Sequence, residues 1–238
     1  MPDRTASQSL EARLGVGVAV GTVLAGAVGF ALLGPSAEQE PRDKGTVAQM
    51  RVETAHKSLS IGDKPEGYAV PIRKVEPSEA IRLALEQVGV KEGPGRQTKY
   101  HDWFVSTPNA KMTAERDGGF SVDDYNGAEW CNMFVSWVGA QLGVKDMGWD
   151  AYTVQHARWF AKKGRWGHKA KPGAVVFFDW QNGPDGGIGG IDHVGLVVKD
   201  NGDGTITTVE GNTNDEVEKR VRSKSLVAGY GYPNYDAD

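Results

Sequence analysis

The sequence predicts an α+β domain in which helices come first along the chain and antiparallel strands follow. In the first half of the C-terminal part, apolar residues recur at helical spacing. The second half contains short runs rich in Val, Ile, Thr, Phe and Tyr, separated by Gly-rich turns. This order is typical of a sheet with helices packed on one side. Hydrophobic residues make up 39% of the chain, which is too high for a disordered protein.

The N-terminal part carries an apolar segment. Leu14 to Leu33 contains no charged residue, and at a rise of ~1.5 Å per residue it matches the hydrocarbon thickness of a bilayer. Arg4 and Arg13 precede it and acidic residues follow, which favours an N-terminus inside and the rest of the chain outside. We interpret residues 1–36 as a cytoplasmic stub with a transmembrane anchor, with a cleaved signal segment as the alternative. The expected localisation is extracytoplasmic, either membrane-anchored or secreted.

The rest of the chain divides into a linker and one domain. Residues 37–75 are polar, without sustained periodicity, and are expected to form a flexible linker. Residues 76–238 have the length of a single domain with its own core. The net charge of −4 argues against nucleic acid as a partner, since phosphate binding needs clustered Lys and Arg. We expect a monomer that contacts the membrane through its N-terminal helix.

The domain contains signals for three helices and four strands. The three helical segments end in Gly, and the last of them ends in Lys-Lys-Gly, a common C-terminal signature; they are residues 77–89, 131–143 and 151–164. The four apolar or β-branched runs are residues 174–178, 193–198, 205–210 and 229–232. The sequence KDNGDGT joins the second and third runs and predicts a hairpin.

Cys131 is the single cysteine of the chain, which excludes an intrachain disulfide framework and any metal site with several thiolates. It stands between turn-like residues and an apolar helical segment, so its sulfur is expected at a helix N-terminus. The unpaired amides and the macrodipole stabilise a thiolate there. A buried, inert Cys is the alternative. An unpaired thiol in an exported protein favours the reactive interpretation.

Two residues on the predicted strands could assist this thiol. His193 follows a Gly-rich loop and begins an apolar strand, and Glu210 ends the strand that the hairpin joins to it. Because antiparallel pairing brings the end of one strand beside the start of the other, Glu210 is expected to reach the ring of His193. Nucleophile, base and orienting group would then come from separate elements, as in a catalytic triad. Solvent-exposed strand ends are the alternative for both residues.

These residues and their surroundings resemble the CHAP family, the cysteine- and histidine-dependent amidohydrolases/peptidases of bacterial and phage cell-wall enzymes. The resemblance covers nearly all of residues 76–232 and rests on several blocks in the family's order, namely QVGVKEGPG, KYHDWF, EWCNMFVSWVG, KPGAVVFFDW, DHVGLVV, GTITTVEGNT and GYGYP. It implies a papain-like fold with Cys131 as nucleophile, His193 as base and Glu210 orienting the imidazole. Asn212 matches a position near the catalytic groups.

The resemblance further implies an exported thiol-dependent hydrolase that cleaves peptidoglycan amide bonds through a thioester. The bond would lie within the stem peptide or between muramic acid and L-alanine. No metal or other cofactor is expected. Trp130 and Trp180 are candidates for stacking on the substrate. Residues 106–126 and 181–192 are longer than the family pattern, so substrate preference transfers least well. A non-enzymatic surface-binding module that uses the same groove is the alternative function, and an amide transferase is a third.

Overall fold

A computed structural model describes residues 69–70 and 72–236. Its centre is a six-stranded sheet in the order β1-β6-β2-β3-β4-β5, in which every neighbouring pair is antiparallel. The strands are β1 (Trp166–Gly167), β2 (Val175–Phe178), β3 (His193–Asp200), β4 (Thr205–Thr213), β5 (Glu216–Ser223) and β6 (Val227–Gly231). The predicted α+β class with an antiparallel sheet is confirmed.

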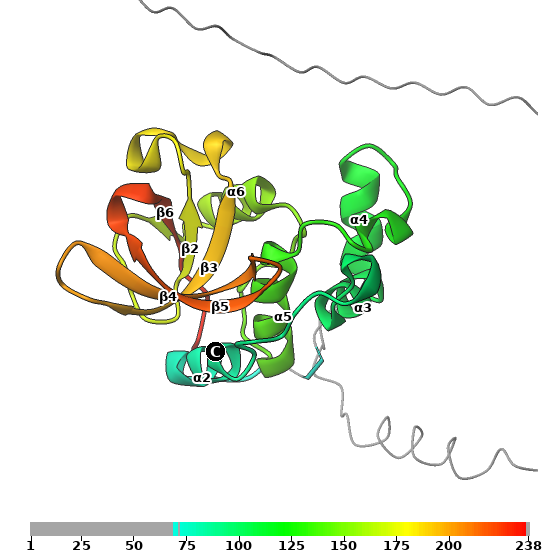
Figure 1. The fold of residues 1–238 in the computed structure, drawn as a ribbon, viewed down its shortest axis with the longest axis horizontal. Helices are drawn as coiled ribbons and strands as arrows, with labels where there is room; N and C mark the ends of the chain where they lie inside the picture. Colours follow the sequence, from blue (N-terminus) through cyan, green and yellow to red (C-terminus); the bar gives the residue numbers. More distant parts are fainter. Residues whose placement is uncertain (1–68, 71, 237–238) are drawn as a thin grey trace, which may run out of the picture. The chain divides into compact units, whose positions relative to one another are not determined.

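Five α-helices precede most of the sheet in the described part of the chain. They are α2 (Pro77–Leu85), α3 (Lys99–Val105), α4 (Pro108–Arg116), α5 (Cys131–Leu142) and α6 (Thr153–Lys162). Short 3-10 turns lie at Pro94–Arg96, Val122–Tyr125, Gly183–Asp185, Ile188–Gly190 and Lys224–Leu226. Helix α5 packs on β3 and β4, whereas α3 and α4 lie on the side of α5 that faces away from the sheet (Figure 1).

Apolar packing explains this arrangement. Helix α5 buries nine of its twelve residues because its sequence, CNMFVSWVGAQL, is apolar on almost every side. All four residues of β2 are buried. Val175 and Phe177 join the main core, which includes the helices, and Val176 and Phe178 join a smaller cluster on the other face of the sheet. The central helix and the central strands therefore form a rigid base for the residues at their ends.

Four helices and strands were not predicted from the sequence, namely α3, α4, β1 and β5. Helix α4 lies within residues 106–126, the stretch that is longer than the family pattern, and α3 directly precedes this stretch. Strand β5 pairs with β4 and consists mostly of charged residues. Strand β5 is an edge strand, and only Val217 among its side chains is fully buried. The only apolar residues of β5, Val217 and Val221, are four positions apart, so its sequence lacks the strict alternation that predicts a strand.

The predicted anchor or signal segment, residues 1–36, lies outside the described residues, as does most of the predicted linker. The last linker residues that the structure describes pack on the domain. Val75 is buried, and its amide donates to the carbonyl of Tyr235 at 2.9 Å. Among residues 69–70 and 72–236, no helix has the length and apolar character needed to cross a membrane.

Candidate active site

Cys131 is the first residue of α5, with Trp130 as the N-cap residue. Its side chain is largely buried but not sealed, with 7% of the residue exposed. The first amides of an α-helix have no partner within the helix, and the helix dipole adds positive potential at this end. The same amides can receive an oxyanion that forms next to the sulfur.

His193 is the first residue of β3 and is 8% exposed. Its ring is stacked on that of Trp180, with 5.6 Å between the centroids. The ring of Phe178 is also stacked against it, with 6.1 Å between the centroids. Burial by itself would lower the pKa of His193. Hydrogen bonding and charge interaction with Cys131 and Glu210 outweigh burial and raise this pKa to about 9. These contacts therefore favour the protonated form of the ring.

Glu210 lies on β4 and is fully buried. Nε2 of His193 donates to its Oε2 at 3.2 Å, and the Thr208 hydroxyl donates to its Oε1 at 2.6 Å. Burial would raise the pKa of this carboxyl, but the hydrogen bonds from His193 and Arg222 lower it to about 2. Gly195 gives the side chain its room, because a Cβ at that position would lie 2.7 Å from Cγ of Glu210.

The structure thus brings together the three residues that the sequence analysis selected. Since Nε2 of His193 is held by Glu210, Nδ1 is the ring nitrogen left to interact with the thiol of Cys131. The spacing between helix and sheet depends on Gly211, where a Cβ would lie 2.6 Å from Cβ of Phe134 in α5. The contact between α5 and β4 is therefore close enough for residues of both elements to share one site.

Asn212 lies one residue beyond this close contact, at a bulge in β4, with a φ of 57°. Asn tolerates this left-handed conformation better than most residues do. Its side-chain amide donates to Glu129, which also accepts a hydrogen bond from Arg96 at 2.8 Å. Asn212 therefore contacts a carboxylate two residues before Cys131, and the described hydrogen bond of its side chain does not go to His193.

The two tryptophans selected for substrate binding occupy different environments. Trp130 is fully buried, donates from Nε1 to Glu92 at 2.9 Å and stacks on Tyr100 with 5.3 Å between the ring centroids. The expectation that Trp130 stacks on substrate is wrong, because its faces are covered by the core. Trp180 is 38% exposed beside His193, so one part of its ring remains accessible to a ligand.

A buried polar network that the sequence analysis missed fixes the start of α5. Asn132, next to Cys131, donates to the carbonyl of Asp150 at 2.5 Å and lies 2.7 Å from Nδ1 of His156. Nε2 of His156 lies 2.8 Å from the carbonyl of Met147. Arg116 donates to both carboxylate oxygens of Asp150 at 2.6 and 3.1 Å. These partners are distant in sequence, and no periodic pattern connects them.

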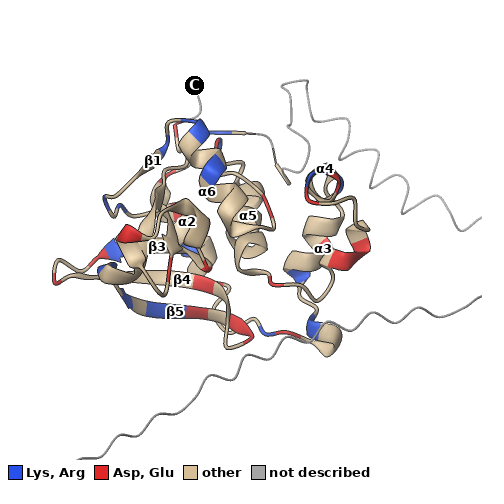
Figure 2. Cartoon of the chain, turned by 90° about the horizontal axis from the view of Figure 1, so that it is seen from above, with Lys and Arg blue, Asp and Glu red and all other residues tan. Residues whose placement is uncertain are grey.

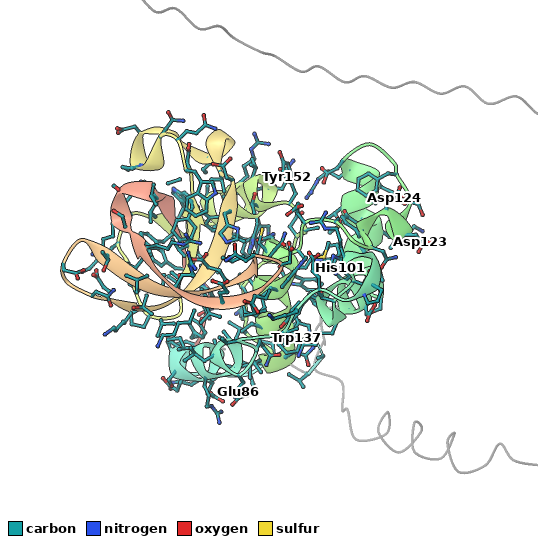
Figure 3. The ribbon with its side chains drawn as sticks, in the orientation of Figure 1. Glu86, His101, Asp123, Asp124, Trp137 and Tyr152 are labelled. Carbon is teal, nitrogen blue, oxygen red and sulfur yellow. The ribbon has the colours of Figure 1, made fainter. Side chains whose placement is uncertain are left out.

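The loop carboxylates lie in different environments. Asp179 is 1% exposed and accepts from the amides of Gln181 and Asn182 at 3.0 and 2.8 Å. Asp123 and Asp124 lie at the outer edge of the helical part, away from the sheet (Figure 3). In the part of the chain that the structure describes, no group of three or more His, Cys, Asp or Glu residues is placed to hold a metal ion.

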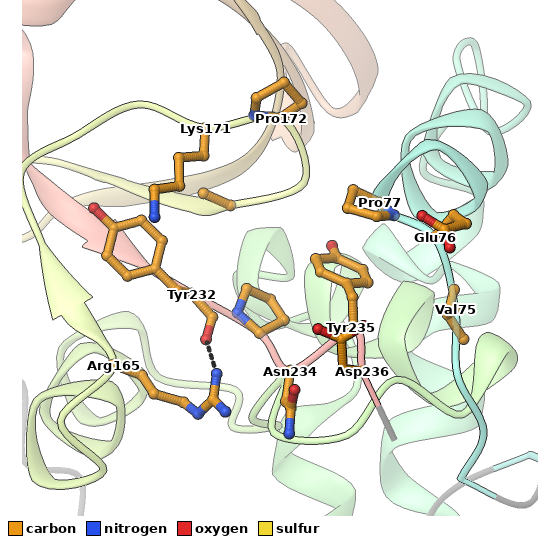
Figure 4. Close-up of a pocket in the computed structure, with 12 residues that line it drawn as sticks. Val75, Glu76, Pro77, Arg165, Lys171, Pro172, Tyr232, Asn234, Tyr235 and Asp236 are labelled. Atoms are coloured by element: carbon orange, nitrogen blue, oxygen red, sulfur yellow. Dashed lines mark hydrogen bonds between the residues drawn. The ribbon is translucent and has the colours of Figure 1, made fainter. Parts of the chain in front are cut away.

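A pocket of about 580 Å³ lies elsewhere, between the start of α2 and the last described residues (Figure 4). Its wall includes Tyr232, Tyr235 and Lys171, and the guanidinium of Arg165 donates to the carbonyl of Tyr232 across it. None of the three residues Cys131, His193 and Glu210 lines this pocket.

One of three comparisons with known proteins found a match. Residues 123–212 match the family model described as the CHAP domain. The matched range contains Cys131, His193 and Glu210. No curated protein and no solved structure matches the chain.

Proposed function

We propose that the chain hydrolyses amide bonds of peptidoglycan through Cys131, His193 and Glu210. The match of residues 123–212 to the CHAP domain model supports this, since members of that family are in general cysteine- and histidine-dependent amidohydrolases. The bond is either within the stem peptide or between muramic acid and L-alanine. The observation that carries the proposal is the buried set of thiol, imidazole and carboxylate, in which the pKa of His193 is raised to about 9. A solvated histidine would keep a value near ~6.5.

The proposed reaction has two stages. His193 holds the proton of the Cys131 thiol, and the thiolate attacks the carbonyl carbon of the amide. The amides at the start of α5 stabilise the oxyanion, and the imidazolium then gives its proton to the leaving amine. This leaves an acyl group on sulfur as a thioester. Water, deprotonated by His193, attacks the thioester, releases the carboxylic acid and restores the thiol.

The proposal includes a substrate contact at Trp180 and an extracytoplasmic location. The partly exposed ring of Trp180 lies beside His193 and offers an apolar face for part of the substrate. Cys131 lies at the start of the central helix, and His193 and Glu210 lie on the sheet. These positions support a papain-like arrangement. The uncharged segment of residues 14–33 supports an extracytoplasmic location, where peptidoglycan would be accessible.

The test is mass spectrometry of the products formed from defined muropeptides. Wild-type protein is expected to release one new amine and one new carboxylate per bond cut, and the mass of the fragments identifies the bond. Cys131→Ala is expected to release no product above background. Equal product from Cys131→Ala would overturn the assignment of the nucleophile. Binding without product in the wild type would favour the surface-binding module, and a product joined to an added amine would favour a transferase.

A further inference from the structure

Arg222 connects the edge strand to the candidate active site. It lies on β5, which carries both basic and acidic residues (Figure 2), and its side chain is 18% exposed. Nε donates to Oε1 and Oε2 of Glu210 at 3.0 and 3.2 Å, and Nη2 donates to Oε2 at 2.6 Å. Both carboxylate oxygens are therefore held by one guanidinium, a geometry that fixes the plane of the carboxylate.

The same guanidinium also contacts the aromatic residues around His193. Its carbon lies 5.0 Å from the ring centroid of Trp180 and 5.9 Å from that of Phe178. A cation over an aromatic face is attracted by the ring quadrupole. Trp180 in turn stacks on His193 at 5.6 Å between centroids. Arg222 thus touches two of the groups that hold the imidazole, while no described contact joins it to the ring itself.

We propose that Arg222 is a positioning residue for the catalytic imidazole, which holds Glu210 against Nε2 of His193 and Trp180 against the face of the ring. This proposal rests on the proposed function for its effect on turnover. Its structural part stands on the contacts of Arg222 alone. The sequence of β5 carries no strand pattern, so no local signal places Arg222 beside Glu210.

The energetic reason lies in the burial of Glu210. A carboxylate that is fully buried pays a large desolvation cost unless it is paired. His193 can lose its proton during the reaction, whereas an arginine stays charged at every working pH. Arg222 therefore keeps Glu210 ionised when the imidazole is momentarily neutral. The anion is then in place each time His193 takes up a proton.

The charged groups around this cluster come from several elements. Cys131 of α5 and Glu129, which precedes α5, interact electrostatically with His193, and Glu218 of β5 interacts with Arg222. Removing Arg222 leaves these groups unchanged and takes away one of the two main interactions that lower the pKa of Glu210. That pKa is then expected to rise, so protonation of Glu210 would weaken the thiolate–imidazolium pair at a higher pH than in the wild type.

The experiment follows the alkylation of Cys131 by iodoacetamide as a function of pH in the full chain. It needs no peptidoglycan substrate. For Arg222→Gln we expect the acid midpoint of alkylation to move up by about one pH unit, the lower end of the effect of a nearby opposite charge. Muropeptide turnover at pH 7 should fall by about 10- to 100-fold through kcat, because general acid–base catalysis contributes ~10²–10⁴-fold. Arg222→Lys should recover part of the alkylation midpoint and part of kcat, since a lysine restores the positive charge but not the two-point contact of the guanidinium.

Arg220→Gln is the matched control. Arg220 lies on the same strand and pairs with Glu218 at 2.8 Å rather than with Glu210. Its alkylation profile should equal that of the wild type. A folded Arg222→Gln protein with a wild-type profile would overturn the proposal. If that variant does not fold, Arg222→Lys serves instead, and a profile identical to the wild type overturns it in the same way. A shifted profile in a chain without hydrolytic activity would support the positioning role and reject the proposed function.

Discussion

Replacement of His193 by alanine is expected to lower kcat/KM for muropeptide hydrolysis at pH 7 by about 10³-fold or more, within the range of general acid–base catalysis. The variant loses both the proton acceptor for Cys131 and the proton donor for the leaving amine. Its thiol also loses the adjacent imidazolium, so Cys131 should react more slowly with iodoacetamide at pH 6–7 than in the wild type. Steady-state kinetics with a defined muropeptide and alkylation rates measure the two effects.

The activity of the wild type is expected to depend on the protonation of His193. The pKa of His193 is raised to about 9, so the imidazolium is present below that pH and is lost as the pH rises through it. Wild-type activity should therefore decline above pH 9, and the gap between wild type and His193→Ala should narrow there. His168 is exposed and serves as the control, because His168→Ala should keep wild-type kinetics. Wild-type rates in a folded His193→Ala protein would exclude His193 from the reaction.

Replacement of Gly211 by alanine is expected to destabilise the domain and to reduce activity together. An alanine Cβ would lie 2.6 Å from Cβ of Phe134 and 2.8 Å from the ring of Trp130. These atoms belong to α5 and its N-cap residue, so β4 and α5 must move apart. Overpacking of this kind costs about 1–3 kcal/mol. For a domain of this size each 1 kcal/mol lowers Tm by ~2–4 °C.

Thermal unfolding and muropeptide turnover should be measured on the same protein samples. Activity should fall even at temperatures where the variant is folded, because Cys131 starts α5 whereas Glu210 precedes Gly211 on β4. Gly189→Ala is the control, since a Cβ there has no atom within 4 Å. An unchanged Tm with full activity for Gly211→Ala would show that the spacing of α5 and β4 is not critical for the site.

The helix that begins at Cys131 and the strand pair that carries His193 and Glu210 were both predicted correctly from local sequence patterns. The 131–143 segment has the apolar spacing of a helix, and α5 begins at Cys131. The KDNGDGT turn joins the two strands that carry His193 and Glu210, and β3 and β4 are paired as predicted. The turn residues and the two-residue alternation of side chains determine which residues lie opposite one another in a hairpin. The contact between Glu210 and His193 could therefore be predicted from residues close in sequence.

The parts that were missed depend on contacts between distant segments. Arg222 reaches Glu210 from an edge strand whose charged residues give no strand signal, and Asn132, Asp150 and His156 meet only after three elements have packed. Trp130 was a candidate for stacking on the substrate, yet Tyr100 from α3 covers it. A residue type and its neighbours in sequence do not reveal which face tertiary packing will bury.

The central claim is that Cys131 and His193 form an ion pair supported by Glu210. It is tested most directly by measuring the pKa of His193 by NMR, from the ring chemical shifts of the full chain over pH 5 to 11. The account predicts a pKa of about 9 in the wild type and a lower value in Cys131→Ala, because the thiol is one cause of the shift. A wild-type pKa at or below the ordinary ~6.5, or a value unchanged by Cys131→Ala, would contradict it.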